Sequence, residues 1–552
     1  MTARHLLATT LLILTHTAMA DQCQYSGRQV LWGDLHIHTG FSMDAYAFGA
    51  RVDPAAAYRF AKGAPRTLID GAQHALARPL DFAAVTDHAE NFGVMGLCAS
   101  EQIEHEYCEA FEAVSDGRSR DGFTRFFLPA LAGQVPPVCA VEGGDCRAAQ
   151  LDLWSRTIEA AESANEPCEF TAFVANEWSA MPGDLHLHRN LIYASSTVPR
   201  VPVNAIDEPH AADMWRALAQ RCRPENGCDV LAIAHNPNLG MGVTFGVETL
   251  DARELELRRN YERVMEIHQH KGQSECYPGA GFTDEACAFE IRLPTPLIGK
   301  GTLTPGDHAR VASGYARQAL SKGLLASLAG APNPLRLGFI GSTDTHDGRP
   351  GDVEERGWRG HVGRMDTPGA TRHQLAVNNP GGLAAVWVRE NTREAIFAAL
   401  ERRETYATSG PRIQLEVFAT REPGDWCASD GMPDDTVVMG GTLSRGRDAP
   451  VFYVRALKDH TPLARVDIVK LFVAGGKTQQ TIRTVRTGDA GAASVCARFE
   501  DGDIAPEQPA LWYARVLEQA TPRWRSETGE VQESIRERAW SSPIWNSTVN
   551  GG

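Results

Sequence analysis

The stretch VLWGDLHIHTG, residues 30–40, contains the pattern Gly-Asp-Leu-His-x-His, and MPGDLHLHRN, residues 181–190, contains it again. In a β-strand, residues i and i+2 point to the same face of the sheet. Each histidine pair would therefore direct two imidazoles toward one point, which suits a metal ion held by ring nitrogens. The residues that follow the two pentads differ completely, so the repeat need not record a duplication. We expect each pentad to be a strand end that converges on one metal cluster.

Apolar runs alternate with helical patterns along most of the chain. Runs with strand character occupy residues 30–38, 80–88, 169–179, 190–196, 229–237, 263–270 and 335–346. Helical patterns occupy residues 53–63, 210–222, 252–264 and 392–405. Buried apolar strands that alternate with helices are typical of a parallel α/β barrel. The sequence therefore predicts the α/β class and a barrel.

Polar side chains stand where these apolar runs stop. They are His36, His38, His88, Glu177, His235, Glu266, Asp344 and His346. In a parallel barrel the carboxyl ends of the strands line the active site. Loop starts usually carry Gly, Asn, Asp or Ser, so repeated His and Glu favour a shared site over ordinary strand ends. Ring nitrogens combined with carboxylates suit Zn, Mn or Fe better than an all-oxygen Mg or Ca site.

Beyond about residue 410 the strand-like runs are separated by Gly, Pro and Asp clusters. These runs occupy residues 412–420, 450–458, 465–476, 478–488 and 509–519. They predict a smaller β-rich domain, residues 411–552, packed on a barrel domain of residues 21–410. Residues 95–170 and 275–335 are long for barrel connections and contain several cysteines. We expect these two regions to be disulfide-braced insertions over one barrel face.

Residues 1–20 predict a signal peptide, because basic residues precede a short apolar run and Ala18-Met19-Ala20 forms a small-x-small cleavage site. All twelve cysteines follow this segment, and none forms Cys-x-x-Cys. This usage favours disulfides over a thiolate zinc site and predicts a periplasmic or secreted protein. The pairs closest in sequence are Cys98/Cys108, Cys139/Cys146, Cys222/Cys228 and Cys276/Cys287. The pairing of the other four cysteines stays open.

Composition and charge exclude several functional classes. The chain has 43% hydrophobic and 22% charged residues, an ordinary globular composition. Its formal net charge of −15 makes nucleic acid an unsuitable partner. No internal apolar run is long enough for stable membrane insertion. A Ser or Cys hydrolase is disfavoured, because the cysteines look paired and no Gly-x-Ser-x-Gly motif surrounds a nucleophile.

The motifs GDLHIHTGFSMDA, AVTDHAE, ANEW, IAHNP and GSTDTH are similar, in this order, to those of the PHP (polymerase and histidinol phosphatase) superfamily. Together with RRETYATSGPRI and ERAWSSPIW, they more closely resemble the bacterial domain-of-unknown-function family 3604. The resemblance covers nearly the whole chain after residue 20. It implies a distorted (β/α)7 PHP-like barrel that holds two or three divalent metal ions at its strand ends.

The resemblance also implies the site residues. It assigns metal ligation to His36, His38, His88, Glu177, His188, His235, Asp344 and His346. Asp44 stands where many phosphatases of the superfamily carry His, so the number of metals stays open between two and three. We expect catalytic roles for Asp44 and for His186, which would face the substrate or support a ligand. His268 and His270 match no ligand of the superfamily.

These observations predict an exported metal-dependent hydrolase of phosphate mono- or diesters. Two metals can share a hydroxide as nucleophile and neutralise the charge of a small anionic ester substrate. Arg189 and Arg412 are expected to bind its nonbridging oxygens with their planar guanidinium groups. Sulfate, phosphonate or lactone substrates would suit the same site. A noncatalytic envelope binding protein with structural metals is the alternative from another class.

Overall fold

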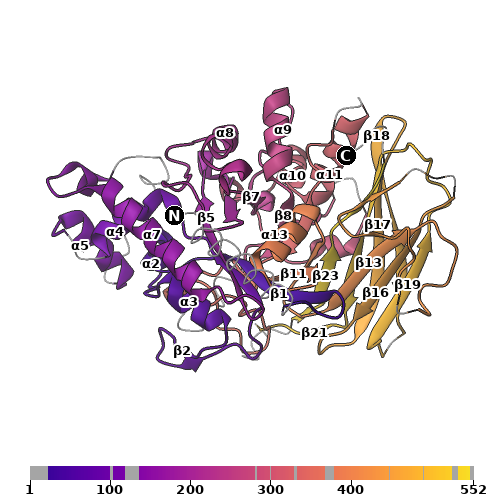
Figure 1. Ribbon diagram of the computed structural model, residues 1–552, viewed down its shortest axis with the longest axis horizontal. Helices are drawn as coiled ribbons and strands as arrows, with labels where there is room; N and C mark the ends of the chain where they lie inside the picture. The colour runs from indigo at the N-terminus through magenta and orange to yellow at the C-terminus, as the bar shows by residue number, and fades with distance from the viewer. Residues whose placement is uncertain are drawn as a thin grey trace, which may run out of the picture.

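The structure is a computed structural model with a mixed α/β architecture: one large mixed sheet, helices, and a β-rich C-terminal region (Figure 1). It describes residues 23–99, 103–117, 136–279, 283–298, 300–328, 332–366, 378–429, 431–444, 446, 448–488, 490–524 and 533–547. The predicted signal peptide, residues 1–20, lies outside the described residues. The α/β class and the β-rich C-terminal region are confirmed.

The first half of the large sheet contains every strand predicted before residue 350. In sheet order these are β10 (Gly338–Gly341), β8 (Val264–Gln269), β7 (Val230–Ala234), β6 (Arg189–Tyr193), β5 (Thr171–Trp178), β4 (Phe82–Val85) and β1 (Gln29–Ile37). Except for the start of β1, all their residues are buried. Continuous apolar runs of this kind are typical of strands that are covered on both faces.

The strand directions differ from the parallel arrangement that the sequence predicts. β4 pairs in parallel with β1 and β5, and β8 pairs in parallel with β7 and β10. β6 is antiparallel to both of its neighbours, so the all-parallel prediction is wrong at this strand. An isolated parallel bridge, Ile37↔Thr345, links β1 to the segment after β10. The two ends of the strand series therefore approach each other, while the (β/α)7 barrel itself stays a prediction.

Three of the four helices predicted from the sequence begin with a side-chain cap, from Asp53, Asp251 or Thr392. The helices are α2 (Met43–Ala47), α3 (Pro54–Ala61), α4 (Phe92–Cys98), α5 (Glu106–Ser115), α7 (Cys146–Ala164), α8 (Ala211–Arg221), α9 (Ala252–Tyr261), α10 (Pro305–Ala312), α11 (Ala316–Ser327) and α13 (Arg393–Arg402). The Asp53 side chain accepts the Ala56 amide at 2.8 Å and Pro54 occupies the first helical position of α3. Asp251 and Glu254 form a capping box that starts α9.

Single turns of 3-10 helix lie in the connections. They are η1 (Ala89–Asn91), η3 (Pro137–Ala140), η4 (Pro182–Asp184), η5 (Pro224–Asn226), η6 (Pro237–Leu239), η7 (Glu285–Ala288), η8 (Thr295–Leu297) and η9 (Gly363–Met365). Four of these eight turns, η3, η4, η5 and η6, begin with proline, whose fixed φ suits the first position of a helical turn.

The large sheet continues into the C-terminal region. Beyond β1 its antiparallel strands are β11 (Leu383–Val388), β12 (Thr405–Thr408), β23 (Arg538–Ser541), β20 (Ala510–Glu518), β17 (Leu463–Ala474) and β18 (Lys477–Arg486). A second sheet contains β14 (Val437–Val438), β13 (Gln414–Thr420), β16 (Val451–Leu457) and β19 (Ser494–Glu500). The two sheets pack together, with the rings of Phe452 and Trp512 4.7 Å apart. The boundary at residue 410 stays a prediction, because the large sheet runs across it.

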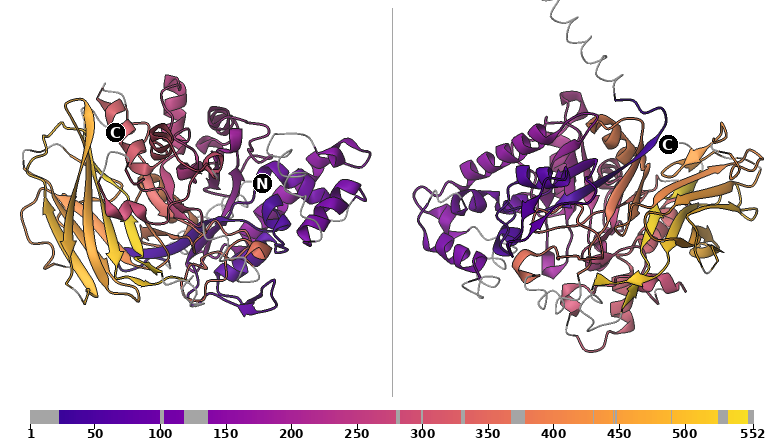
Figure 2. Two further views of the ribbon diagram at one scale, coloured as in Figure 1. Left: turned by 180° about the vertical axis from the view of Figure 1, so that it is seen from behind. Right: turned by 90° about the horizontal axis from the view of Figure 1, so that it is seen from below.

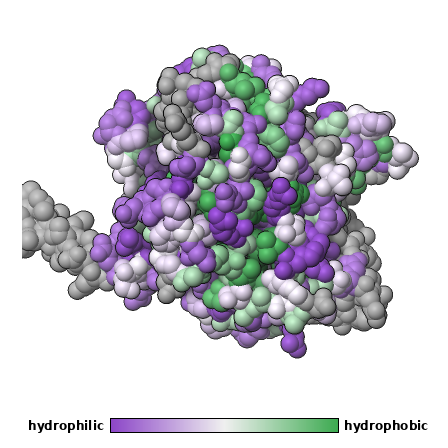
Figure 3. All heavy atoms as spheres, turned by 90° about the vertical axis from the view of Figure 1, so that its right-hand side faces the viewer, coloured by the Kyte–Doolittle hydropathy of each residue, from purple (hydrophilic) through white to green (hydrophobic). Residues whose placement is uncertain are grey.

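Several short strands remain, some paired within the large sheet and the others in two separate two-stranded sheets. They are β2 (Arg66–Thr67), β3 (Gln73–His74), β9 (Gly272–Gln273), β15 (Thr442–Leu443), β21 (Thr521–Pro522), β22 (Ser534–Ile535) and β24 (Ile544–Asn546). The edge strand β18 is largely exposed and carries Lys477, Arg483 and Arg486. Charged side chains on an edge strand oppose pairing with another chain. The face at this end of the molecule mixes hydrophilic side chains with smaller hydrophobic patches (Figure 3).

The two predicted insertions are braced by disulfides but lie apart. Helices α4 and α7 pack together at one end of the molecule, where the Cys98–Cys108 disulfide joins α5 to α4 and α7 packs on β5 (Figure 1). Helix α11 packs on β17 and β18 near the other end (Figures 1 and 2). The prediction that both cover one face is therefore wrong, because each insertion buries its apolar side against a different part of the sheet.

All twelve cysteines form disulfides. The four pairs expected from sequence proximity are confirmed, and Cys23–Cys168 and Cys427–Cys496 complete the set. Such usage indicates an oxidising environment. Among the described residues, no helix has both the length and the apolar character needed to cross a bilayer.

Candidate metal centre

Side chains from β1, β5 and the segment after β10 converge at one point. His36 Nε2 lies 3.2 Å from His38 Nε2, 3.3 Å from Glu177 Oε2 and 3.2 Å from Asp344 Oδ1. His38 Nε2 lies 3.3 Å from Glu177 Oε2 and 3.2 Å from Asp344 Oδ1. All four residues are buried. Two ring nitrogens and two carboxylate oxygens around one point are a suitable donor set for a divalent transition metal.

A second group shares the other oxygen of Glu177. Its Oε1 lies 2.7 Å from His188 Nδ1, 3.3 Å from His235 Nε2 and 3.5 Å from His88 Nδ1. Glu177 therefore has one oxygen toward each group, as a carboxylate that bridges two metal ions would.

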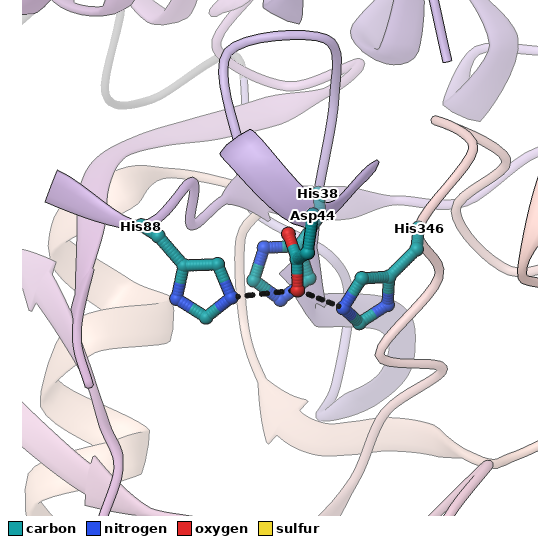
Figure 4. A group of neighbouring side chains, drawn as sticks. All are labelled: His38, Asp44, His88 and His346. Carbon is teal, nitrogen blue, oxygen red and sulfur yellow. Dashed lines mark hydrogen bonds and ion pairs between the residues drawn. The ribbon is translucent and has the colours of Figure 1, made fainter. Parts of the chain in front are cut away.

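Asp44 lies between two further histidines. Its Oδ2 is 3.1 Å from His88 Nε2 and 3.0 Å from His346 Nε2, with the ring of His38 behind them (Figure 4). The donor atoms of these four residues all lie within 4.8 Å of one another. The side chains of Asp44 and His88 are 22% and 13% exposed, so this side of the cluster reaches solvent.

Several buried donor atoms in the cluster lack partners. Within the described residues, His188 Nε2, both nitrogens of His235, both nitrogens of His270 and Asp344 Oδ1 make no hydrogen bond. Buried polar atoms are almost always paired with protein or with a ligand. Ring nitrogens that approach carboxylates at about 3.3 Å without hydrogen bonds fit atoms arranged around a cation. The donor set therefore fits divalent metal ions.

The other ring nitrogens are held by protein groups. His36 Nδ1 lies 3.1 Å from Glu266 Oε2, and His38 Nδ1 lies 2.9 Å from Ser42 Oγ. Ser42 Oγ in turn donates to Asp87 Oδ1 at 2.8 Å. Metal-ligating histidines usually use one nitrogen in this way, which fixes the ring and its tautomer.

The charges in the cluster shift the pKa values of its members. Burial lowers the pKa of His36 well below its ordinary value. Burial acts in the same direction on His38, but Asp344 and Glu177 outweigh it and hold the pKa of His38 well above its usual range. Burial would raise the pKa of Glu177, yet the neighbouring histidines, led by His88, hold it well below. The carboxylate is therefore ionised, the form that binds cations.

The backbone explains how these residues reach one rim. β1 and β5 carry His36 and Glu177 near their carboxyl ends, and His88, His235 and Asp344 follow β4, β7 and β10. His188 instead precedes β6, which runs in the opposite direction. The amino end of an antiparallel strand lies at the same edge as the carboxyl ends of its neighbours. The expectation that the second pentad is a strand end is wrong: it begins in η4 and continues through an irregular segment that ends where β6 begins. Asp344 has φ +55°, a strained conformation that is common at functional sites.

The predicted substrate arginines are engaged by protein groups. Arg189 is buried and donates to Glu262 Oε1 at 3.0 Å and to the carbonyls of Leu187 and Thr244. Arg412 donates to the carbonyls of Arg78 and Pro79. None of these partners belongs to the cluster. Their predicted role in binding substrate stays untested.

The remaining histidines occupy different places. His186 lies beside His188, with 5.2 Å between ring centroids, and its Nδ1 makes no hydrogen bond in the described part of the chain. His268 packs against Phe289 and Trp540. His270 Nε2 lies 3.3 Å from Asp344 Oδ2, so it borders the cluster.

Sequence reasoning missed three groups that contact the predicted ligands. Glu266 was one of the polar strand-end residues but was not expected to contact His36. Lys271 Nζ contacts Asp344 Oδ2. Asp34 Oδ1 accepts the His36 amide at 3.3 Å and the Thr343 amide at 3.1 Å. The contact of Asp34 could have been predicted, because Asp34 is the aspartate of the first pentad and stands two residues before His36, on the same face of the strand.

A family model described as a protein of unknown function, DUF3604, matches residues 25–490 and 481–548. An uncharacterised protein of Chlamydia pneumoniae is 24% identical over 294 residues, 52% of this chain and 34% of that protein. The chain therefore spans about a third of the length of that relative. No solved structure matches the chain. Because the family model covers most of its length, the chain belongs to the DUF3604 family.

Proposed function

We propose that this protein is a metal-dependent hydrolase of phosphate esters. One observation carries the proposal: ligand side chains from distant parts of the chain converge, with buried ring nitrogens that lack protein partners in the described residues. Two or three ions of Zn, Mn or Fe suit these imidazole and carboxylate donors. Bound there, divalent cations would supply Lewis-acid activation of water and neutralise the charge of the ester.

The residues of the chain would hold these ions in two main positions. His36, His38 and Asp344 would hold one ion, and His188 and His235 another, with Glu177 between them. Asp44 and His346, together with His88, would provide a third position. The PHP resemblance supports this assignment, and so does the series of seven strands whose ends approach through the Ile37↔Thr345 bridge.

Hydrolases of sulfate esters, phosphonates or lactones would use the same donors, so the substrate must be tested directly. A noncatalytic binding protein with structural metals is the alternative from another class. Structural metal sites are closed by protein ligands, whereas catalytic sites keep an open position. The partial exposure of Asp44 and His88 favours the hydrolase.

Export completes the proposal. The signal-like segment at residues 1–20 and the six disulfides support a periplasmic or secreted location. An extracytoplasmic hydrolase of this kind would act on small anionic esters.

The test is metal analysis of protein purified without chelator, followed by a panel of phosphate mono- and diesters, sulfate esters, phosphonates and lactones assayed with the metals found. We expect at least two bound divalent ions per chain and hydrolysis of a phosphate ester that chelator abolishes and metal restores. Tightly bound metal with no hydrolysis of any ester would favour the binding protein. Absence of metal would contradict both functions.

A further inference from the structure

A tight hairpin places a histidine and a lysine directly against the metal centre. β8 pairs with β9 in the register His268↔Gln273 and Gln269↔Gly272, so His270 and Lys271 form the two-residue turn. Lys271 Nζ contacts Asp344 Oδ2, and His270 Nε2 lies 3.3 Å from the same oxygen. The other oxygen of Asp344 faces His36 and His38. The hairpin tip thus lies on the opposite side of Asp344 from the first ligand group.

The hairpin tip is fixed by side chains and backbone groups outside the hairpin as well as within it. The His270 amide donates to the Thr343 carbonyl at 3.2 Å, and the Asn379 amide donates to the His270 carbonyl at 3.1 Å. Asn238 Nδ2 donates to the Lys271 carbonyl at 3.2 Å, and the Lys271 amide donates to Gln269 Oε1 at 2.6 Å. Because the backbone of the turn is held by these hydrogen bonds, the base of the Lys271 side chain needs little reorganisation when an anion binds.

A second cation approaches from the segment that packs on this hairpin. The Gln273 amide donates to the Glu290 carbonyl at 3.1 Å, and a Cβ on Gly272 would lie 3.5 Å from the Arg292 amide nitrogen. The Arg292 side chain donates to Asn378 Oδ1 at 3.0 Å and interacts electrostatically with Asp344. In the described part of the chain Arg292 forms no ion pair with a carboxylate.

The net charge around the cluster favours an ester that carries two negative charges. Asp44, Glu177 and Asp344 are the carboxylates of the cluster. Two divalent ions would already outweigh them, and Lys271 and Arg292 add further positive charge. A neutral lactone or a monoanionic diester would leave this excess uncompensated. A group with two negative charges would compensate more of it, because Lys and Arg donate strong hydrogen bonds to phosphate oxygens.

We propose that the His270-Lys271 turn and Arg292 form an anion-binding arm that holds the terminal oxygens of a phosphate monoester dianion. This inference rests on the proposed hydrolase function and narrows its substrate class. Hydrolysis forms a P–O bond to the oxygen of water and breaks the ester P–O bond. One proton of water passes to the leaving alcohol and the other stays on the phosphate. Inorganic phosphate is then the product held by the arm.

The test measures binding of inorganic phosphate to the metal-loaded protein by calorimetry. Lys271→Ala and Arg292→Ala should each weaken phosphate binding about 10-fold or more, with metal content unchanged. Lys271→Arg and Arg292→Lys keep the charge and should retain more of the affinity than the alanine variants. Lys322→Ala is the matched control, since Lys322 lies on α11 and pairs with Glu248.

The kinetic counterpart compares monoesters with diesters. Lys271→Ala should raise KM for monoesters more than for diesters, because a diester presents only one negative charge. Unchanged phosphate affinity in both alanine variants would overturn the inference. Loss of metal from Lys271→Ala would also overturn it, because Lys271 would then serve only to orient Asp344. If the unaltered protein binds no metal and hydrolyses no ester, the proposed function fails instead.

Discussion

At the scale of single residues, His36 and His346 each use one ring nitrogen to contact a protein group and direct the other into the cluster. His36 Nδ1 contacts Glu266 while its Nε2 faces the shared point. His346 shows the same division, with Nδ1 2.8 Å from the Asp344 carbonyl and Nε2 beside Asp44. The oriented nitrogen fixes the tautomer that leaves the other available as a metal ligand.

The first prediction is that His36→Ala removes at least one metal ion and nearly all hydrolysis. His36 Nε2 belongs to the first ligand group and has no substitute there, so the activation of water by two neighbouring cations is lost. Metal analysis and ester hydrolysis measure the two effects. His210→Ala is the control, because His210 is exposed and makes no side-chain cap at α8. Full metal content in His36→Ala would contradict the ligand assignment.

The second prediction concerns Glu266, which contacts His36 but none of the other predicted ligands. Glu266→Gln keeps the size of the side chain but replaces one of the two carboxyl oxygens beside His36 Nδ1 by an amide group, so the ring of His36 is held less firmly. We expect metal affinity to fall about 10- to 100-fold, the usual effect of altering such a partner. Competition with a chelator measures this affinity. Glu256→Gln on the exposed face of α9 is the control and should leave the metal affinity unchanged. If Glu266→Gln also leaves the metal affinity unchanged, Glu266 does not orient His36 for metal binding.

The sequence identifies ligands better than their supporting residues. His36-x-His38 was recognisable because a strand repeats every two residues. Asp344-x-His346 was recognisable only by its residue types, since it follows β10 and Asp344 has φ +55°. Glu266 and Lys271 carry no such signal, since each contacts the cluster across a long sequence separation that only the fold creates. Arg189 shows the converse: an arginine beside a ligand looks suited to substrate, yet its guanidinium is bound by Glu262.

At the scale of elements, apolar runs and helical patterns were sufficient to predict strands β1, β4, β5, β6, β7, β8 and β10 and helices α3, α8, α9 and α13. Strand direction was not predictable in this way, because a buried run looks the same in either direction. β6 is the example. β11 and β12 were not predicted as strands. Their apolar runs are short, and only their pairing with β1 and with each other makes them strands.

The third prediction tests the hairpin that carries Lys271. Gly272 has φ +100°, and a Cβ there would lie 2.3 Å from the Glu290 carbonyl oxygen. Gly272→Ala should therefore lower the free energy of unfolding by about 1–3 kcal/mol, since L-residues are strained in this conformation and the backbone contact must open. Thermal or denaturant unfolding measures the loss. Gly301→Ala is the control, because no atom of the described residues lies within 4 Å of its added Cβ and its φ is not positive. If the two variants are equally stable, the backbone around Gly272 and Glu290 can move apart at no cost, and the hairpin is not fixed as described.

At the scale of the whole molecule, buried ion pairs connect the site-bearing part of the chain to the C-terminal strands. Arg515 on β20 lies 2.9 Å from Glu275, 3.0 Å from Asp284 and 2.7 Å from Asp467 on β17. Arg317 on α11 contacts Glu275 at 2.6 Å and Asp284 at 2.7 Å. Glu275 and Asp284 flank Cys276 in the segment that the Cys276–Cys287 disulfide closes. The C-terminal strands therefore anchor the segment that leads to Arg292.

The last prediction follows from this network. Burial raises the pKa of Glu275, but Arg515 and Arg317 outweigh it and hold the pKa well below its ordinary value. The contribution of Glu275 to stability is therefore present above the ordinary pKa of glutamate and is lost as the pH falls through the depressed value. Arg515→Ala leaves buried carboxylates without their main partner and should cost about 3–5 kcal/mol of unfolding free energy at neutral pH. The unfolding free energy of Arg515→Ala should also depend less on pH in acid, because the pKa of Glu275 is no longer lowered by Arg515.

Denaturant unfolding across pH measures both effects, with Arg498→Ala as the control. Arg498 pairs with Glu500 on the exposed face of β19, where an ion pair contributes about 0–1 kcal/mol. If Arg515→Ala is no less stable than Arg498→Ala, the network does not hold the C-terminal strands to the site-bearing segment. If instead Arg515→Ala is destabilised and also binds phosphate more weakly at unchanged metal content, the C-terminal strands act on the site by positioning the segment that carries Arg292.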